Sequence, residues 1–91
     1  MRRAAPAPRT YVITIASMKF APQTLTVRSG DHVVWVNHDL FPHTATQRES
    51  LFNSGSILPE ASWTLEAGAP GAYTYTCAFH PTMQARLRVL P

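Results

Sequence analysis

The feature that most constrains the fold of this chain is a predicted hairpin near its end. Residues 72–77 and 85–89 both alternate apolar and polar side chains, which is the period of a β-strand. Only a short loop separates the two segments, so they are expected to pair as a hairpin. Cys77, His80 and Met83 fall on or beside that loop, with two residues between each. The hairpin therefore brings a thiol, an imidazole and a thioether around one point.

These side chains are soft or borderline metal donors. Two imidazoles and one thiolate with a weak axial thioether form the donor set of blue-copper electron-transfer sites. The second imidazole must come from His32, His38 or His43. His43 is the best candidate, because it follows a tight Pro42 corner on a separate strand and can be held by the body of the domain. His32 and His38 lie in polar, turn-like surroundings and are expected to be solvated.

Other interpretations of the same residues explain less of the pattern. Cys77 is the only cysteine, so an internal disulfide is excluded, and taken alone it is as readily a small buried side chain as a ligand. A catalytic Cys–His pair has an available orienting group in Asp39, but Met83 has no role in such chemistry. A structural zinc site usually has several cysteines, and a multicopper oxidase needs further histidine clusters. We therefore expect a protein that is not an enzyme.

The whole chain is predicted to form one all-β domain. No segment has a helical period, and turn residues separate short strand-like segments: 11–15, 24–28, 33–36, 43–47, 62–65, 72–77 and 85–89. Seven to eight such strands favour an antiparallel Greek-key β-sandwich. A parallel α/β sheet would need crossover helices. Residues 18–22 are expected to be an irregular link, and residues 48–61 a long surface connection.

Charge and composition narrow the classes of partner. Residues 1–10 are predicted to be a disordered leader, and residues 11–91 the folded domain. Three of the eight basic residues lie in the leader, and the other five balance five acids, although the net charge is +3. The high isoelectric point therefore gives no support for a nucleic-acid partner. No apolar run is long enough to span a membrane, and the leader lacks the apolar core of an intact secretory signal.

An ordered set of short motifs extends through nearly the whole domain. They are Phe20-Ala21-Pro22, Gly30-Asp31, Val33-Val34-Trp35-Val36-Asn37, Pro42-His43-Thr44, Ser54-Gly55, Gly71 to Cys77, and His80-Pro81-Thr82-Met83. This set resembles the cupredoxins, the small type 1 blue copper proteins, and is most similar to the amicyanin and plastocyanin group. The resemblance implies one copper ion per chain, with His43, Cys77 and His80 as in-plane ligands and Met83 as the long axial ligand.

The resemblance also assigns supporting roles next to the ligands. Thr44 stands where relatives often have Asn, and its backbone N–H is expected to reach the Cys77 sulfur. Phe79 keeps a backbone N–H where amicyanin-like loops can have Pro, so a second bond to the same sulfur is expected. Such bonds tune the reduction potential of the metal.

The implied function is that of a soluble electron carrier whose copper cycles between Cu(I) and Cu(II). Electrons are expected to pass through the exposed edge of His80. An apolar patch around it, made of Phe41, Pro42, Phe79 and Pro81, is expected to dock redox proteins transiently. The resemblance implies the bacterial periplasm or an equivalent extracytoplasmic space, and we expect a monomer. Two alternatives stay open: a copper chaperone or storage protein, and a metal-free β-sandwich interaction module.

Overall fold

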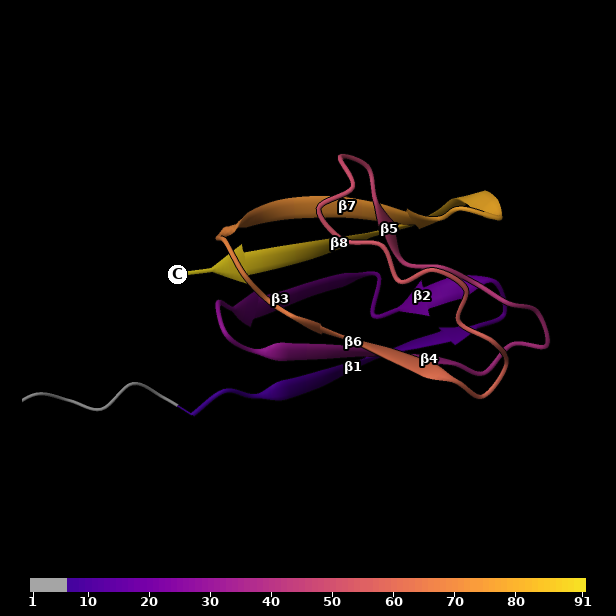
Figure 1. The fold of residues 1–91 in the computed structure, drawn as a ribbon, viewed down its shortest axis with the longest axis horizontal. Helices are drawn as coiled ribbons and strands as arrows, with labels where there is room; N and C mark the ends of the chain where they lie inside the picture. Colours follow the sequence, from indigo (N-terminus) through magenta and orange to yellow (C-terminus); the bar gives the residue numbers. More distant parts are fainter. Residues whose placement is uncertain (1–6) are drawn as a thin grey trace, which may run out of the picture.

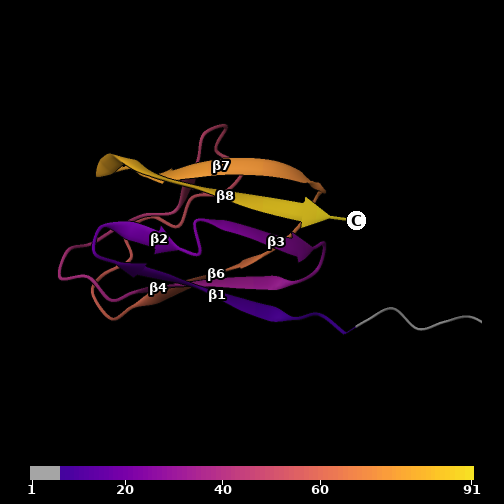
Figure 2. The same cartoon turned by 180° about the vertical axis from the view of Figure 1, so that it is seen from behind.

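The computed structural model describes residues 7–91, which form a sandwich of two β-sheets without a helix (Figures 1 and 2). The strands are β1 (Thr10–Ala16), β2 (Lys19–Ala21), β3 (Thr24–Arg28), β4 (His32–Asn37), β5 (Thr46–Gln47), β6 (Ser62–Glu66), β7 (Gly71–Cys77) and β8 (His80–Leu90). The predicted all-β sandwich of seven to eight strands is confirmed. Within residues 7–91, no helix exists that is long and apolar enough to cross a bilayer.

The two sheets are mixed, which corrects the purely antiparallel arrangement predicted from the sequence. One sheet has the order β2-β1-β4-β6 and the other the order β3-β8-β7-β5. The pairs β1–β4 and β3–β8 are parallel, and the remaining pairs are antiparallel. No crossover helix is needed, because the chain passes to the opposite sheet between the paired strands. Between β1 and β4, for example, it forms β3 in the other layer.

The core lies between the sheets and follows from the period-2 pattern of the strands. In β4, Val33, Trp35 and Asn37 point inward and are buried, and their neighbours are half-buried. Trp35 packs edge-on against Tyr75 of β7 with ring centroids 5.5 Å apart, and against Trp63 of β6 at 5.4 Å. Burying each large apolar side chain contributes about 1.5–3 kcal/mol, so these aromatic residues hold the layers together.

Several boundaries differ from the sequence prediction. The predicted irregular link contains β2, which pairs with β1 and buries Phe20 in the core. The predicted leader comprises residues 1–10. Its first six residues lie outside the described part of the chain, and β1 begins at Thr10, the last residue of the predicted leader. The Arg9 N–H donates to the Asp31 carboxylate at 2.9 Å, and the Arg9 carbonyl accepts from His32 N–H. Residue 10 therefore pairs in register with β4, which a local reading of prolines and charges does not reveal.

The connection over residues 48–61 contains no helix, as predicted, but part of it is buried and is not a purely surface segment. Phe52 and Ile57 are buried in the core, and Ile57 forms an isolated bridge with His43. A second bridge joins Asn53 to Thr46 of β5, which is shorter than the predicted strand 43–47. The connection thus covers one end of the sandwich and fixes the backbone at His43.

Candidate metal centre

The β7–β8 hairpin places three of the predicted donors at one end of the sandwich, at the right of Figure 1. Cys77 pairs with His80 across a tight turn, while the neighbouring Thr76 pairs with Gln84. Residues 81–83 of β8 therefore have no partner on β7, which makes a bulge. Met83 lies on the strand rather than in a loop, and its side chain turns inward and is buried.

His43 enters the same end from the segment between β4 and β5. Its backbone N–H and carbonyl both bond to Ile57, at 3.1 and 2.7 Å, and its side chain is fully buried. The His43 Nδ1 atom lies 3.6 Å from the Cys77 sulfur, although 34 residues separate them in sequence. The ring of His80 lies beside it, with centroids 5.4 Å apart. The structure thus brings His43 and Cys77 into contact and places the ring of His80 next to His43.

Thr44 supports the sulfur and the hairpin at once. Its backbone N–H donates to the Cys77 sulfur at 3.3 Å, which confirms that predicted contact. Its hydroxyl accepts a hydrogen bond from the Ala78 N–H at 2.7 Å, so the threonine side chain holds the turn between the donors. The second predicted bond, from the Phe79 N–H to the sulfur, is not formed within residues 7–91.

Asn37 is a supporting residue that the sequence reasoning missed. It is fully buried at the end of β4, and its amide donates to the carbonyls of Phe41 and Ile57 at 2.8 and 2.9 Å. Its side-chain oxygen accepts from the Asp39 N–H at 2.9 Å. The signal was available, because an Asn at the end of a strand commonly accepts the backbone N–H two residues further on in an Asx turn. Asn37 shapes the loop that presents His43.

Asp39 contacts the other ring nitrogen of His43. Its Oδ2 atom lies 2.8 Å from His43 Nε2 and accepts from the Met18 N–H at 2.9 Å, and its Oδ1 accepts from the Ser17 N–H at 2.7 Å. Burial alone would raise the pKa of this carboxyl. The Met18 N–H, the His43 imidazole and the Ser17 N–H outweigh that effect and lower the pKa below its ordinary value. Asp39 therefore carries a negative charge at neutral pH.

The surroundings of the sulfur are dry. Cys77 is fully buried, and Tyr75 of the same strand is buried against Trp35 and Phe20. Burial raises the pKa of Tyr75 well above its ordinary value, so its hydroxyl stays neutral. Such a medium strengthens interactions between a metal and its ligands, because little water screens them.

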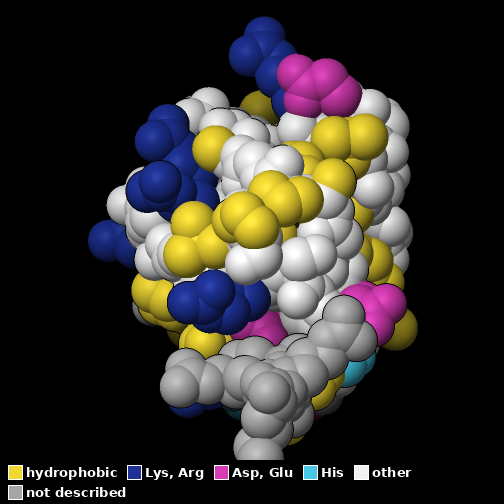
Figure 3. All heavy atoms as spheres, turned by 90° about the vertical axis from the view of Figure 1, so that its left-hand side faces the viewer, with side chains coloured by type: hydrophobic (Ala, Val, Ile, Leu, Met, Phe, Trp, Pro, Cys, Tyr) yellow, Lys and Arg dark blue, Asp and Glu magenta, His cyan; other side chains and the backbone are white. Residues whose placement is uncertain are grey.

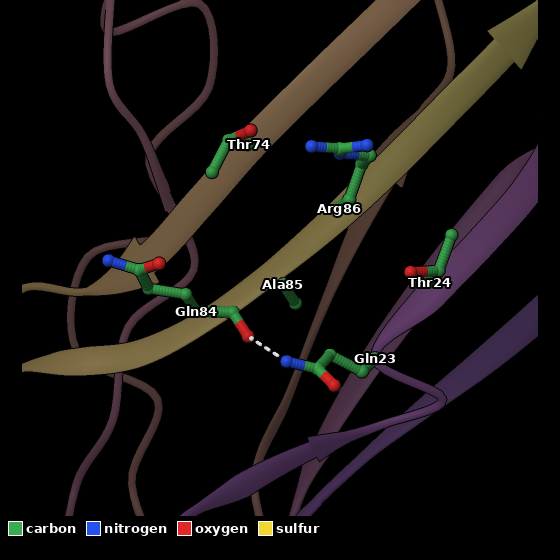
Figure 4. Close-up of a pocket in the computed structure, with 6 residues that line it drawn as sticks. All are labelled: Gln23, Thr24, Thr74, Gln84, Ala85 and Arg86. Atoms are coloured by element: carbon green, nitrogen blue, oxygen red, sulfur yellow. Dashed lines mark hydrogen bonds between the residues drawn. The ribbon is translucent and has the colours of Figure 1, made fainter.

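Two hollows lie near this end of the molecule. Met18, Phe20, Thr82 and Met83 belong to the lining of a cavity of about 340 Å³, so the buried thioether is next to an open space. Figure 4 shows the neighbouring hollow of about 320 Å³, lined by Gln23, Thr24, Thr74, Gln84, Ala85 and Arg86. Gln23 donates to the Gln84 carbonyl there at 3.3 Å. This second hollow contains none of the predicted donors.

The residues of the predicted donor set and docking patch differ in their exposure to solvent. His43, Cys77 and Met83 are buried, whereas His80 is half-buried. Phe41 and Phe79 are 58% and 53% exposed, and Pro42 and Pro81 are exposed as well. His32 and His38, expected to be solvated, have side chains 42% and 50% exposed and lie near Glu66 and Glu60.

The donors fit a copper ion by their chemistry. A thiol and an imidazole nitrogen face each other in a dry site, and a thioether is buried on the adjoining strand segment, which is the softness that copper selects. Within residues 7–91, no group of three or more His, Cys, Asp or Glu side chains has an arrangement that could hold a metal ion without movement of its members. His43 and Cys77 are therefore the two predicted donors in direct contact with each other, and His80 and Met83 remain predicted ligands.

Known proteins with a similar sequence or structure include small copper-protein relatives of the cupredoxin type. A family model described as a cupredoxin-like domain matches residues 1–89. Amicyanin of Paracoccus denitrificans is 30% identical over 83 residues, covering 86% of this chain and 63% of that protein. Amicyanin-alpha of Methylorubrum extorquens is 30% identical over 90 residues, covering 93% and 75%. A solved amicyanin point mutant in its oxidised state superimposes with a TM-score of 0.84 at 28% identity, covering 89% and 82%.

The fold and the donor set define a small β-sandwich protein with a soft metal site at one end. The chain belongs to the cupredoxin-like family. It spans 63% of the length of the two Paracoccus amicyanins that it matches.

Proposed function

We propose that this protein is an electron carrier that holds one copper ion through His43, Cys77, His80 and Met83. The observation that supports this most strongly is the buried contact of 3.6 Å between His43 Nδ1 and the Cys77 sulfur. Copper bound there would supply a one-electron couple between Cu(I) and Cu(II). The Cys77 thiol would lose its proton on metal binding, because the thiolate is the ligand.

The residues around the donors hold them in place before a metal arrives. Ile57 fixes the backbone of His43, and Thr44 binds both the Cys77 sulfur and the turn that follows it. A rigid site changes little between two oxidation states, so electron transfer needs little reorganisation. The N–H bond to the sulfur withdraws electron density from the thiolate and thereby raises the reduction potential.

The apolar patch of Phe41, Pro42, Phe79 and Pro81 supports a docking role. Phe79 and Pro81 flank the half-buried His80 in the chain, Phe41 and Pro42 precede His43, and all four side chains are exposed. Exposed apolar side chains next to a site are typical of a contact surface, and a small patch suits a transient complex. We place the electron path through His80 for this reason. We further propose that the protein acts as a monomer in the bacterial periplasm or an equivalent extracytoplasmic space, with redox proteins as partners.

The first test is a titration of the reduced, metal-free protein with Cu(II), followed in the visible spectrum. We expect an intense blue charge-transfer band that saturates at one copper per chain and is lost in Cys77→Ser. His38→Ala is the matched control, because His38 is half-exposed and outside the site, and it should keep the band. No band, or a band that survives Cys77→Ser, would contradict the proposal.

One observation favours a second candidate, a protein that delivers or stores Cu(I). Met18 is 37% exposed and lines the same cavity as Met83, so a second thioether, a donor that suits Cu(I), is available in that cavity. A carrier should retain copper through many redox cycles. Transfer of Cu(I) to a competing chelator within seconds, lost in Met18→Leu, would favour the delivery function instead.

A further inference from the structure

The contact between Asp39 and His43 has a chemical consequence for the metal site. Asp39 Oδ2 and His43 Nε2 are 2.8 Å apart, the His43 side chain is fully buried, and the Asp39 side chain is only 13% exposed. An ionised carboxylate accepts hydrogen bonds and has no proton to donate. The Nε2 atom of His43 must therefore carry the hydrogen in this contact.

In a neutral imidazole, a hydrogen on one nitrogen leaves a lone pair on the other. For His43 the lone pair is then on Nδ1, the atom that faces the Cys77 sulfur. We infer that Asp39 is the positioning residue that keeps His43 protonated at Nε2 and presents Nδ1 to the metal. This inference rests on the proposed function, because it names a residue that prepares the same site.

The Asp39 carboxylate is itself fixed from two sides. Its oxygens accept the N–H groups of Ser17 and Met18 in the β1–β2 turn, and its own N–H donates to Asn37. Ser17 and Met18 have φ values of 51° and 60°, a left-handed conformation that is unfavourable for residues other than glycine. The turn holds this conformation while it aims both N–H groups at Asp39. Rotation of the carboxylate away from His43 would break these bonds.

A carboxylate behind a ligating imidazole makes the ring a better electron donor. It also places a negative charge near the metal, which favours Cu(II) over Cu(I) because Cu(II) carries the larger positive charge. Removal of such a partner typically lowers metal affinity by about 10- to 100-fold. Asp39 is thus expected to tighten Cu(II) binding and to lower the reduction potential.

The test replaces Asp39 with Asn, which keeps the shape but removes the charge and one acceptor. In the metal-free wild type, a two-dimensional ¹H–¹⁵N spectrum of the imidazoles should show His43 protonated at Nε2. In Asp39→Asn we expect a mixture of tautomers, a loss of Cu(II) affinity of about 10- to 100-fold in chelator competition, and a higher reduction potential.

Asp31 provides a matched control at the far end of β4. Its carboxylate also accepts two backbone N–H groups, those of Arg9 and Arg28 at 2.9 Å each, and it is buried, but it does not contact His43. Asp31→Asn should lose stability and leave the tautomer, the affinity and the potential unchanged.

The outcomes separate the inference from the proposed function. A wild-type His43 protonated at Nδ1 would overturn the inference without any variant, even if Asp39→Asn fails to fold. Equal affinity and potential in Asp39→Asn and the wild type would overturn it as well. A wild type that binds no copper but shows the Nε2 tautomer would reject the copper function and leave the role of Asp39 on His43 intact.

Discussion

At each end of β4, an aspartate accepts two backbone N–H groups. Asp31 precedes the strand and holds Arg9 and Arg28, which ties the start of β1 to the end of β3. Asp39 follows the strand and holds Ser17 and Met18, and it also reaches His43. The same type of hydrogen bonding therefore joins strands at one end of β4 and positions a carboxylate beside the proposed ligand His43 at the other.

Asp31 should make the stability depend on pH in the acid range. The N–H groups of Arg9 and Arg28 outweigh its burial and lower the pKa of the folded carboxyl below the ordinary 3.8. A lowered pKa means that stability is present above pH 3.8 and is lost as the pH falls through the folded value. The free energy of unfolding in urea should thus exceed that of Asp31→Asn at pH 7, and the difference should shrink toward pH 2.

The comparison between wild type and variant cancels the contribution of other carboxyl groups. A difference that stays constant from pH 7 to pH 2 would contradict the role of the ionised Asp31 side chain. A matched exposed variant, Glu66→Gln on the outer side of β6, should change the unfolding curve little at either pH.

At the scale of elements, the site depends on two segments that meet only in the folded chain. The β7–β8 hairpin carries Cys77, His80 and Met83, and the segment after β4 carries His43. Thr44 joins them through its N–H to the sulfur and through its hydroxyl to Ala78. The sandwich alone brings the two segments near each other, and Thr44 determines how closely they are fixed.

Thr44→Val should loosen the ligand turn while keeping the backbone bond to sulfur. The Ala78 N–H loses its acceptor, at a cost of about 1 kcal/mol in the free energy of unfolding. The Ala78 amide should also exchange with solvent faster, measured by hydrogen exchange with NMR detection. Thr26→Val on the exposed face of β3 is the control and should stay within about 0.5 kcal/mol of wild type. Unchanged exchange at Ala78 would show that Thr44 does not fix the turn.

At the scale of the molecule, the two ends differ in chemical character. The turn between β7 and β8 lies at the end away from the C-terminus (Figure 1). Phe79 on this turn and Phe41 in the segment after β4 are both exposed. The opposite end, seen in Figure 3, has Lys and Arg side chains along one side and hydrophobic side chains across its middle. Basic side chains far from the proposed copper site, and exposed apolar side chains next to it, suit a carrier that docks through the end with the donors.

Docking through the apolar end predicts a specific loss on adding charge there. In Phe79→Glu, electron self-exchange between oxidised and reduced copies should slow by about tenfold or more, because two like charges are brought together. The blue band should remain unchanged. NMR line broadening in mixtures of the two oxidation states measures the rate.

Val12→Glu is the matched control for that variant. Val12 is 54% exposed, nearly the same as Phe79 at 53%, but it lies on β1, outside the proposed patch. Its self-exchange rate should stay close to that of wild type. Equal slowing in both variants would attribute the effect to net charge and remove the apolar patch from the mechanism.

The sequence by itself determined the features that depend on neighbours along the chain. Alternation over residues 72–77 and 85–89 requires strands, because successive side chains of a strand point to opposite faces. The short loop between them requires a hairpin, which places Cys77 and His80 together whatever the rest of the fold. The all-β class followed in the same way, from the absence of any helical period.

The tertiary structure decided what depends on residues far apart in sequence. The parallel pairs β1–β4 and β3–β8, the cover formed by residues 48–61, and the contact of Asp39 with the β1–β2 turn all arise from packing of the two sheets. Local periodicity carries no information on these contacts, because it is the same for a parallel or an antiparallel neighbour. The 3.6 Å approach of His43 to Cys77 belongs to this group, since only closure of the sandwich brings the two side chains within reach.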